Sequence, residues 1–353
     1  MEEKVLTKEE KEKLRKERQK RRKYRLLILL LLMLGTGTML ATSTYAWFTS
    51  NKNVSVESLK VNIEAKNGIQ ISADATNWKS IVQKTDLIGA RATGGKYTTA
   101  VNQIPETLEP VSTTGIPETG KLPMYYGVVE SDENTGNYIL TATKTVERDN
   151  NEDRGDNDLD PAKFIAFDLF FKVKEDIPVY LQAGSGVSAV TGEGEADTGI
   201  KNASRIAFIV EGNKPDGTAL NEIQGLVGGT TSTIWEPNAG SHTAAGVAQA
   251  RDVYNKTTTA GDTNDALSYF GVKAPITLDK KVLLNSEAAE YFTEVTPGIK
   301  TNKGFDKNVS LFTLSAGITK VRIYMWVEGQ DVDCENNASG GNVSFDLKIT
   351  TVA

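Results

Sequence analysis

The chain has 353 residues, a formal net charge of −6 and an apolar fraction of 39%. This composition is sufficient to bury a core, which excludes an intrinsically disordered protein and leaves room for one large domain or two ordinary ones. The single cysteine, Cys334, excludes an internal disulfide, and with the single histidine, His242, it leaves too few soft ligands for a zinc site.

The N-terminus has the charge pattern of an export signal. Residues 1–25 hold twelve Lys or Arg against six Glu, residues 26–46 hold no charge, and residues 47–353 carry the remaining −12. A basic segment before an apolar run is typical of a secretory signal whose basic end stays in the cytoplasm. We therefore expect a basic cytoplasmic region 1–25, a signal peptide or membrane helix 26–46 and an extracellular domain 47–353, which is not expected to bind nucleic acid.

Two fates of the leader are open. Thr44 and Ala46 offer small residues at positions −3 and −1 of a signal-peptidase site, which predicts cleavage before Trp47. Retention as a membrane anchor is the alternative, because 21 uncharged residues are about the length that spans a bilayer. Cleavage is favoured because only Leu26–Leu34 is continuously apolar.

The segment after the cleavage site is a candidate donor strand for assembly. Trp47 and Phe48 are costly to leave in water, so they bury either in their own domain or in another copy. We predict that residues 47–57 pair with the sheet edge of a neighbouring copy, with Trp47, Phe48, Val54 and Val56 as anchors. The alternation of apolar residues changes phase after Val56, which predicts a bulge near Ser58.

Later segments alternate apolar and polar residues with the period of a β-strand that has one face on a core. These segments are residues 165–173, 206–210, 321–327 and 343–349. The polar face of the last one predicts a sheet with one wet face, and the Gly- and Asn-rich residues 328–342 predict a long hairpin loop before it. The fold class is therefore all-β, an antiparallel β-sandwich or jelly roll.

Two stretches, 90–160 and 212–274, are rich in Gly and Thr and are expected to be long insertions on the sandwich. In the second, Trp235 lies just before a Pro-Asn turn, which predicts a strand ending there. Leu283–Glu294 is predicted to be a short helix.

An acidic run within the first insertion is the best candidate for a metal site. Carboxylate and amide oxygens are the ligands that Ca²⁺ prefers. Arg154 stands where an EF-hand loop needs glycine, so a solvated loop is favoured over a Ca²⁺ site, and no other cofactor is expected. The candidate ligands are Asp149, Asn151, Asp153, Asp156, Asp158 and Asp160.

No catalytic residue is assigned. Histidine is the commonest general base near neutral pH, and His242 lies in the polar stretch SHTAAG, where we predict a solvated loop residue. Carboxylate pairs alone can run glycosidase chemistry, but they carry little information on an acidic surface.

The stretch TYAWFTSN at Thr44–Asn51 resembles the signal-peptide junction of TasA and camelysin-like matrix proteins of Firmicutes, whose signal peptides are SipW-dependent. VRIYMWVEGQDVDC at Val321–Cys334, closed by VSFDLKIT, is similar to the terminal strands of related surface proteins. The chain differs from TasA in its length and in its long basic region. The resemblance implies an exported, non-catalytic subunit of a cell-surface fibre or biofilm matrix.

That function predicts signal peptidase, other copies of the chain or related matrix subunits as partners, and contact with the membrane through residues 26–46 before cleavage. Polymerisation would proceed by strand addition, a head-to-tail contact that does not close. Two other classes remain open: a membrane-anchored monomeric adhesin or ligand-binding module, and an exported carbohydrate-active enzyme.

Overall fold

The structure is a computed structural model, and its described residues all lie in the unit Tyr45–Ala353. No helix among them is both long enough and apolar enough to cross a membrane. The described residues are 54–63, 68–92, 103–131, 138–145, 162–182, 184–190, 200–244, 246–248, 269–277, 290–300, 310–331, 333–334 and 341–351.

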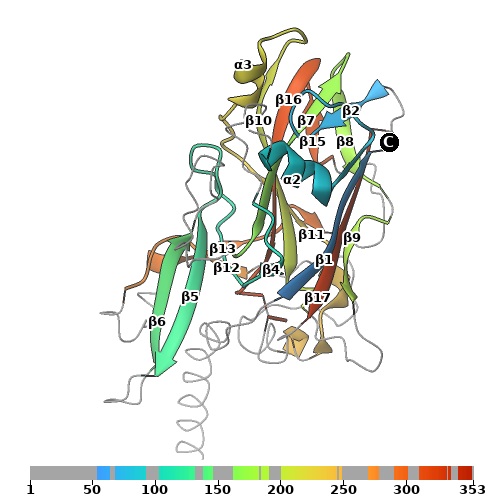
Figure 1. Cartoon of the computed structure of the whole chain (residues 1–353). Coiled ribbons are helices and arrows are strands. Elements are labelled where there is room, and N and C mark those ends of the chain that lie inside the picture. Colours follow the sequence, from blue (N-terminus) through green and yellow to red (C-terminus); the bar gives the residue numbers. More distant parts are fainter. Residues whose placement is uncertain are drawn as a thin grey trace, which may run out of the picture. The chain divides into compact units, whose positions relative to one another are not determined.

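Two large β-sheets dominate the described chain (Figure 1). The seven-stranded sheet has the order β15 (Phe312–Leu314), β8 (Ile177–Leu181), β17 (Asn342–Thr350), β1 (Val54–Ile63), β3 (Ile81–Gln83), with β4 (Thr107–Leu108) on β1 and β9 (Gly186–Val190) on β17. The six-stranded sheet has the order β14 (Ile299–Lys300), β11 (Thr233–Glu236), β10 (Ser204–Lys214), β16 (Gly317–Val327), β7 (Ile165–Val173), β2 (Gln70–Ser72).

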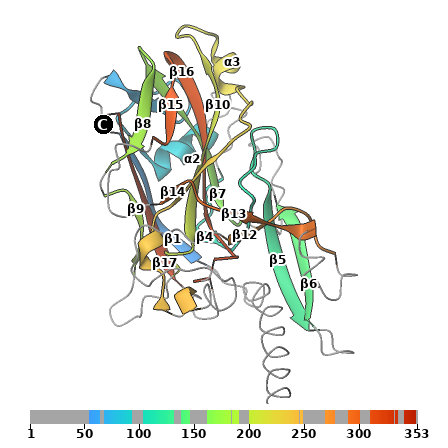
Figure 2. The same ribbon diagram turned by 180° about the vertical axis from the view of Figure 1, so that it is seen from behind.

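Smaller elements complete the described chain, and Figure 2 shows them from behind. Two further pairs of strands are antiparallel, β5 (Met124–Ser131) with β6 (Tyr138–Thr145) and β12 (Tyr269–Val272) with β13 (Phe292–Val295). The helices are α2 (Lys84–Ala92), α3 (Leu220–Gln224) and a 3₁₀ helix at Ala239–Ser241.

The main core lies between the two large sheets and confirms the predicted β-sandwich. The four alternating segments form β7, β10, β16 and β17, and their apolar residues enter one buried cluster. Most strand pairs are antiparallel, whereas β1 runs parallel to β17 and β11 runs parallel to β14. The polar residues of β17 from Ser344 to Lys348 are half-buried, which agrees with a face that is partly wet.

The first described strand, β1, belongs to the chain's own sheet. Its register with β17 shifts between Val56 and Ser58, which confirms the predicted bulge. Val54 and Val56 are 0% and 7% exposed and contribute to the core between the sheets. The prediction of a spare donor segment is therefore wrong for these two valines, because β17 and β4 already pair with their backbone. Thr44, Ala46, Trp47 and Phe48 lie outside the described residues.

A second buried layer covers the other face of the six-stranded sheet. All eleven residues of β16 are buried, although they alternate between apolar and polar or aromatic positions. Leu122, Met124, Tyr269 and Val295 form a cluster with Tyr324 and Trp326 of β16. Both faces of this sheet are therefore covered by protein.

The expected insertions supply part of this cover and are more ordered than predicted. Residues 90–160 contain β4, β5 and β6, and residues 212–274 contain α3, β11 and β12. The strand β11 is an integral part of the six-stranded sheet, and it ends at Glu236 before Pro237, as predicted. Strands β5 and β6 pair with each other, whereas β4, β11 and β12 pair with strands outside these two stretches.

Two local predictions are also wrong. The segment 328–342 does not close a hairpin, because β16 lies in the six-stranded sheet and β17 lies in the seven-stranded one. The helix predicted at Leu283–Glu294 is wrong only over Phe292–Glu294, which belong to the strand β13 that pairs with β12; Glu290 and Tyr291 are helical, and residues 283–289 lie outside the described chain.

Candidate functional site

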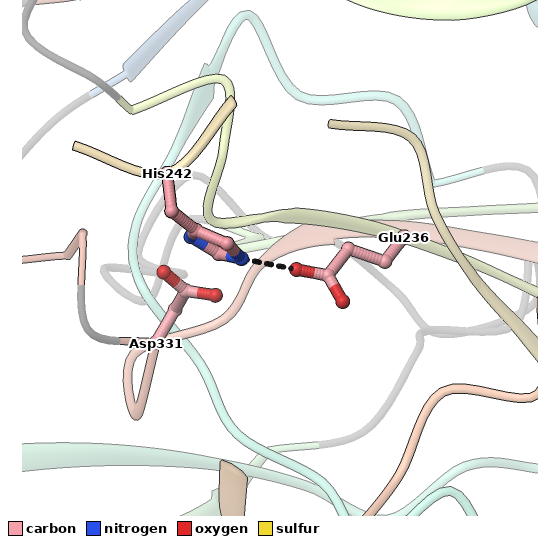
Figure 3. A group of neighbouring side chains, drawn as sticks. All are labelled: Glu236, His242 and Asp331. Atoms are coloured by element: carbon pink, nitrogen blue, oxygen red, sulfur yellow. Dashed lines mark hydrogen bonds and ion pairs between the residues drawn. The ribbon is translucent and has the colours of Figure 1, made fainter. Parts of the chain in front are cut away.

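Five charged side chains meet beneath the surface at one end of the six-stranded sheet. Arg205 comes from β10, Glu236 ends β11, and His242 follows the 3₁₀ helix. Asp331 and Asp333 lie in the segment that follows β16, and Figure 3 shows Asp331 beside Glu236 and His242. All five residues are at most 7% exposed.

Arg205 is the central cation of this network. Its Nη2 lies 2.9 Å from Glu236 Oε1 and also donates to Asp331 Oδ2. Its Nη1 donates to the carbonyl oxygens of Asn202 and Ser204 at 2.8 and 3.1 Å. Burial alone would lower the pKa of Arg205, but the carboxylates of Glu236 and Asp331 outweigh it and hold the pKa above its usual value. The guanidinium is therefore a permanent buried charge.

His242 bridges two carboxylates and is not the solvated loop residue that its polar surroundings in the sequence predict. Nδ1 lies 2.6 Å from Asp333 Oδ2, and Nε2 lies 3.0 Å from Glu236 Oε1, the contact dashed in Figure 3. Burial alone would lower the pKa of His242, but these two carboxylates outweigh it and raise the pKa to about 10. The ring is therefore an imidazolium at neutral pH, with both N–H groups donating.

Asp333 ties the turn around His242 to the segment after β16. The backbone N–H of Thr243 donates to Asp333 Oδ1 at 3.1 Å, and the Thr243 hydroxyl donates to the same oxygen at 2.5 Å. A Cβ added at Gly246 would lie 2.5 Å from Asp333 Oδ1, so the turn approaches the carboxylate too closely for a larger residue. The backbone N–H of Asp333 in turn donates to Asp331 Oδ1 at 2.8 Å. These contacts join segments about 90 residues apart in the sequence.

Glu236, His242 and Asp331 each present one ligand atom, and these atoms lie within 4.8 Å of one another, a spacing that fits a single cation. Glu236 Oε2 is buried without a hydrogen-bond partner among the described residues. However, Glu236 Oε1 and an Asp331 oxygen already contact Arg205 Nη2, and both nitrogens of His242 carry protons. A metal would have to displace a guanidinium and a proton, so the donor set fits an ion-pair network better than a metal centre.

The charged groups of this network are bound to one another and connect segments of the chain. A general base needs a lone pair that can reach a substrate, and His242 has both ring nitrogens engaged with buried carboxylates. Nearby Glu328 accepts from Trp326 Nε1 at 3.0 Å, and burial raises its pKa to about 7. Burial also raises the pKa of Asp331, against the opposing effect of Arg205 and His242. These contacts join the end of β11, the turn around His242 and the segment after β16.

The sequence-predicted site residues and this network do not coincide. The Ca²⁺ candidates Asp149–Asp160 lie outside the described residues. Sequence reasoning missed Arg205, Glu236, Asp331 and Asp333. The signal that the sequence offers is a charged residue inside or shortly after an apolar strand. Arg205, for example, lies inside β10, next to its alternating apolar residues.

The network predicts a loss of stability at alkaline pH. The folded-state pKa of His242, about 10, lies above the unfolded value of about 6.5, so its contribution is complete below pH ~6.5 and is lost as the pH rises through about 10. Each unit of pKa difference corresponds to about 1.4 kcal/mol. We expect the melting temperature to fall between pH 6.5 and pH 10, and thermal unfolding followed by circular dichroism measures it.

The control for this pH dependence is His242→Gln, which removes the titrating ring. This variant should be less stable at neutral pH and should lose less stability than the parent over the same alkaline range. An equal alkaline loss in both proteins would contradict the assigned role of His242.

Comparisons with protein families, with curated proteins and with solved structures gave no match to this chain.

Proposed function

We propose that the chain is an exported, non-catalytic structural subunit of an extracellular fibre or biofilm matrix, assembling with copies of itself or with related subunits. Three features support this proposal. The leader 1–46 has the charge pattern of an export signal. The domain is a β-sandwich, and the candidate site engages its charged groups with one another in buried ion pairs rather than presenting them to a substrate.

The observation that carries the assembly is the place of β1 in its sheet. It lies between β17 and β3, and its register with β17 runs from Ser55 to Ile63. The strand that follows the leader is thus integrated into the sheet, with the C-terminal strand as its parallel neighbour. Because a neighbouring copy offers an identical β17, exchange of β1 between copies would restore every contact that it leaves.

The assembly mechanism that we propose is therefore an exchange of β1 between copies of the chain, in place of the addition of a spare strand. A head-to-tail exchange is a heterologous contact, which generates a filament when it does not close into a ring. Export and removal of the leader before Trp47 would release the strand from its membrane tether. The assembly experiments therefore use the mature chain, which begins at Trp47.

A disulfide between β1 and β17 tests the exchange. Lys60 and Asp346 are register partners; Lys60 is exposed and Asp346 is half-buried, so the double variant Lys60→Cys, Asp346→Cys bridges the strands without entering the core. We expect the oxidised variant to stay monomeric and the reduced variant to form fibres, since only the reduced strand can leave its own sheet. Electron microscopy and sedimentation velocity measure the outcome.

The matched control places a disulfide between two strands that do not exchange. Asn213 and Thr319 are register partners on β10 and β16, and their side chains are hydrogen bonded at 3.0 Å. The variant Asn213→Cys, Thr319→Cys should form fibres in both redox states. Fibres from the oxidised Lys60–Asp346 variant would overturn exchange of β1, and monomers from the unmodified mature chain would overturn the polymer itself.

A further inference from the structure

A second group of buried charges lies on the same covered face of the six-stranded sheet. Lys320 and Arg322 come from β16, Asp168 from β7 and Glu211 from β10. All four residues are at most 3% exposed. Lys320 Nζ lies 3.3 Å from Asp168 Oδ2, so an amine and a carboxyl group meet here with both side chains buried.

We propose that Lys320 and Asp168 join in an intramolecular amide bond, a covalent cross-link between β16 and β7. The bond forms between Lys320 Nζ and Asp168 Cγ, and one Asp168 oxygen leaves as water. The inference does not depend on the proposed fibre function, since it concerns two side chains of one domain.

The geometry favours attack by the amine. Groups that a fold holds in contact and in a fixed orientation react as if at very high concentration, and Lys320 Nζ lies 3.3 Å from an oxygen bonded to the Asp168 Cγ that it would attack. Lys320 also donates to the carbonyl oxygen of Gln224 at 2.8 Å, a contact that orients its nitrogen. Burial, aided by Arg322 and opposed by Asp168, lowers the pKa of Lys320, a shift towards the neutral amine that carries the reactive lone pair.

Arg322 is placed to stabilise the charge that develops on Asp168. Its Nε donates to Asp168 Oδ1 at 2.8 Å and its Nη2 donates to Oδ2 at 3.2 Å. Attack on Cγ places negative charge on these oxygens in the tetrahedral intermediate. A fixed guanidinium in a buried site stabilises such an oxyanion more strongly than water does.

We assign the proton that the leaving oxygen needs to Glu211, whose charge interacts with those of Asp168 and Lys320. Burial raises the pKa of Glu211, against the opposing effects of Arg322 and of the backbone N–H groups of Gly228 and Gly229. The backbone N–H groups of Gly228 and Gly229 hold Oε2 at 2.9 and 3.0 Å, while Oε1 lacks a hydrogen-bond partner among the described residues. This Oε1 lies 3.7 Å from Arg322 Nη1.

The step balances in atoms and charge. A neutral Lys320 amine, an Asp168 carboxylate and a protonated Glu211 give the amide, one water and a Glu211 carboxylate. Arg322 is neutralised by Asp168 before the reaction and by Glu211 after it, so the buried group stays neutral throughout.

The mass of the folded, full chain tests the proposal. After incubation at neutral pH and denaturation, we expect a mass one water below that calculated from the observed N-terminus. Tryptic digestion should give a branched peptide that joins Lys320 to Asp168, with no cleavage after Lys320. An unreduced mass with normal cleavage after Lys320 would overturn the cross-link.

Two variants separate the chemistry from the fold. Lys320→Arg keeps a cation but removes the amine, and Glu211→Gln removes the proton donor; both should show the full calculated mass, with circular dichroism reporting on folding. Lys163 is the internal control, since its Nζ lies 3.0 Å from Glu109 Oε1 in a pair that is more open to water and should stay uncondensed. A water loss that persists in folded Lys320→Arg would place the condensation elsewhere and overturn the assignment.

Discussion

Replacing Arg205 with methionine should destabilise the domain by about 3–5 kcal/mol, because the change removes one partner of a buried ion-pair network. Glu236 and Asp331 would each lose the contact to Nη2 while remaining buried. An unpaired buried carboxylate must then ionise at high cost or take up a proton. Urea denaturation monitored by circular dichroism measures the loss as a fall in the midpoint at constant slope.

An exposed ion pair supplies the control. Lys79 Nζ lies 2.5 Å from Asp86 Oδ1, but the lysine side chain is 48% exposed, so Lys79→Met should change stability by only about 0–1 kcal/mol. Adding Glu236→Gln to Arg205→Met should recover part of the loss, since it removes one of the two buried carboxylates that lost Arg205 and leaves fewer negative charges around His242. A loss in Arg205→Met no larger than that in Lys79→Met would contradict the assignment of Arg205 as the central cation.

Deleting residues 47–56 should unfold the domain rather than yield a folded monomer. The deletion removes Val54 and Val56, and two fully buried valines contribute together about 3–6 kcal/mol. A domain is stable by only about 5–15 kcal/mol in total, and β4 would also lose its pairing partner at Val54 and Ser55. Circular dichroism and sedimentation should report loss of cooperative unfolding and aggregation.

A shorter deletion, 47–53, keeps both valines and is the comparison for the longer one. A folded, monomeric protein after the longer deletion would show that the valines are dispensable and that β1 does not belong to its own sheet. Retention of fibres after the longer deletion would count equally against the structural role given to this strand.

The predictions that succeeded rest on short-range pattern. Alternation over five or more residues identified β7, β16 and β17, because a strand with one apolar face repeats with period two. The phase change after Val56 located a bulge for the same reason, since one extra residue turns the side chains to the other face. The strand β11 ends at Glu236 because Pro237 follows it. The ring of proline restricts the backbone and its nitrogen carries no hydrogen, so it cannot continue the hydrogen bonding between strands.

The alternating pattern does not predict whether the polar residues of these strands are buried. Asp346 and Lys348 on β17 are half-buried, whereas Lys320 and Arg322 on β16 are buried, although both strands show the same alternation. The difference lies in what covers each sheet. Arg322 finds its partner Asp168 at a separation of 154 residues, and no local period reports on such a contact.

His242 was misjudged for a related reason. Its neighbours in the sequence are small and polar, which is typical of a loop in water, and the turn does lie outside the regular strands. The carboxylates that bury it come from Glu236, six residues before it, and from Asp333, 91 residues after it. A single histidine carries no pattern of its own, so its environment depends on which segments the fold brings together.

The sequence by itself determined the fold class, the longest strands of the main core and the charge pattern of the leader, because these depend on local periodicity and composition. Only the tertiary structure decided that β1 pairs in parallel with β17, that the second face of the six-stranded sheet is covered, and that its charges meet in two buried groups. The physical reason is that a polar residue on a strand has two stable outcomes, hydration or a buried partner of opposite charge. Which one applies depends on segments far away in the sequence.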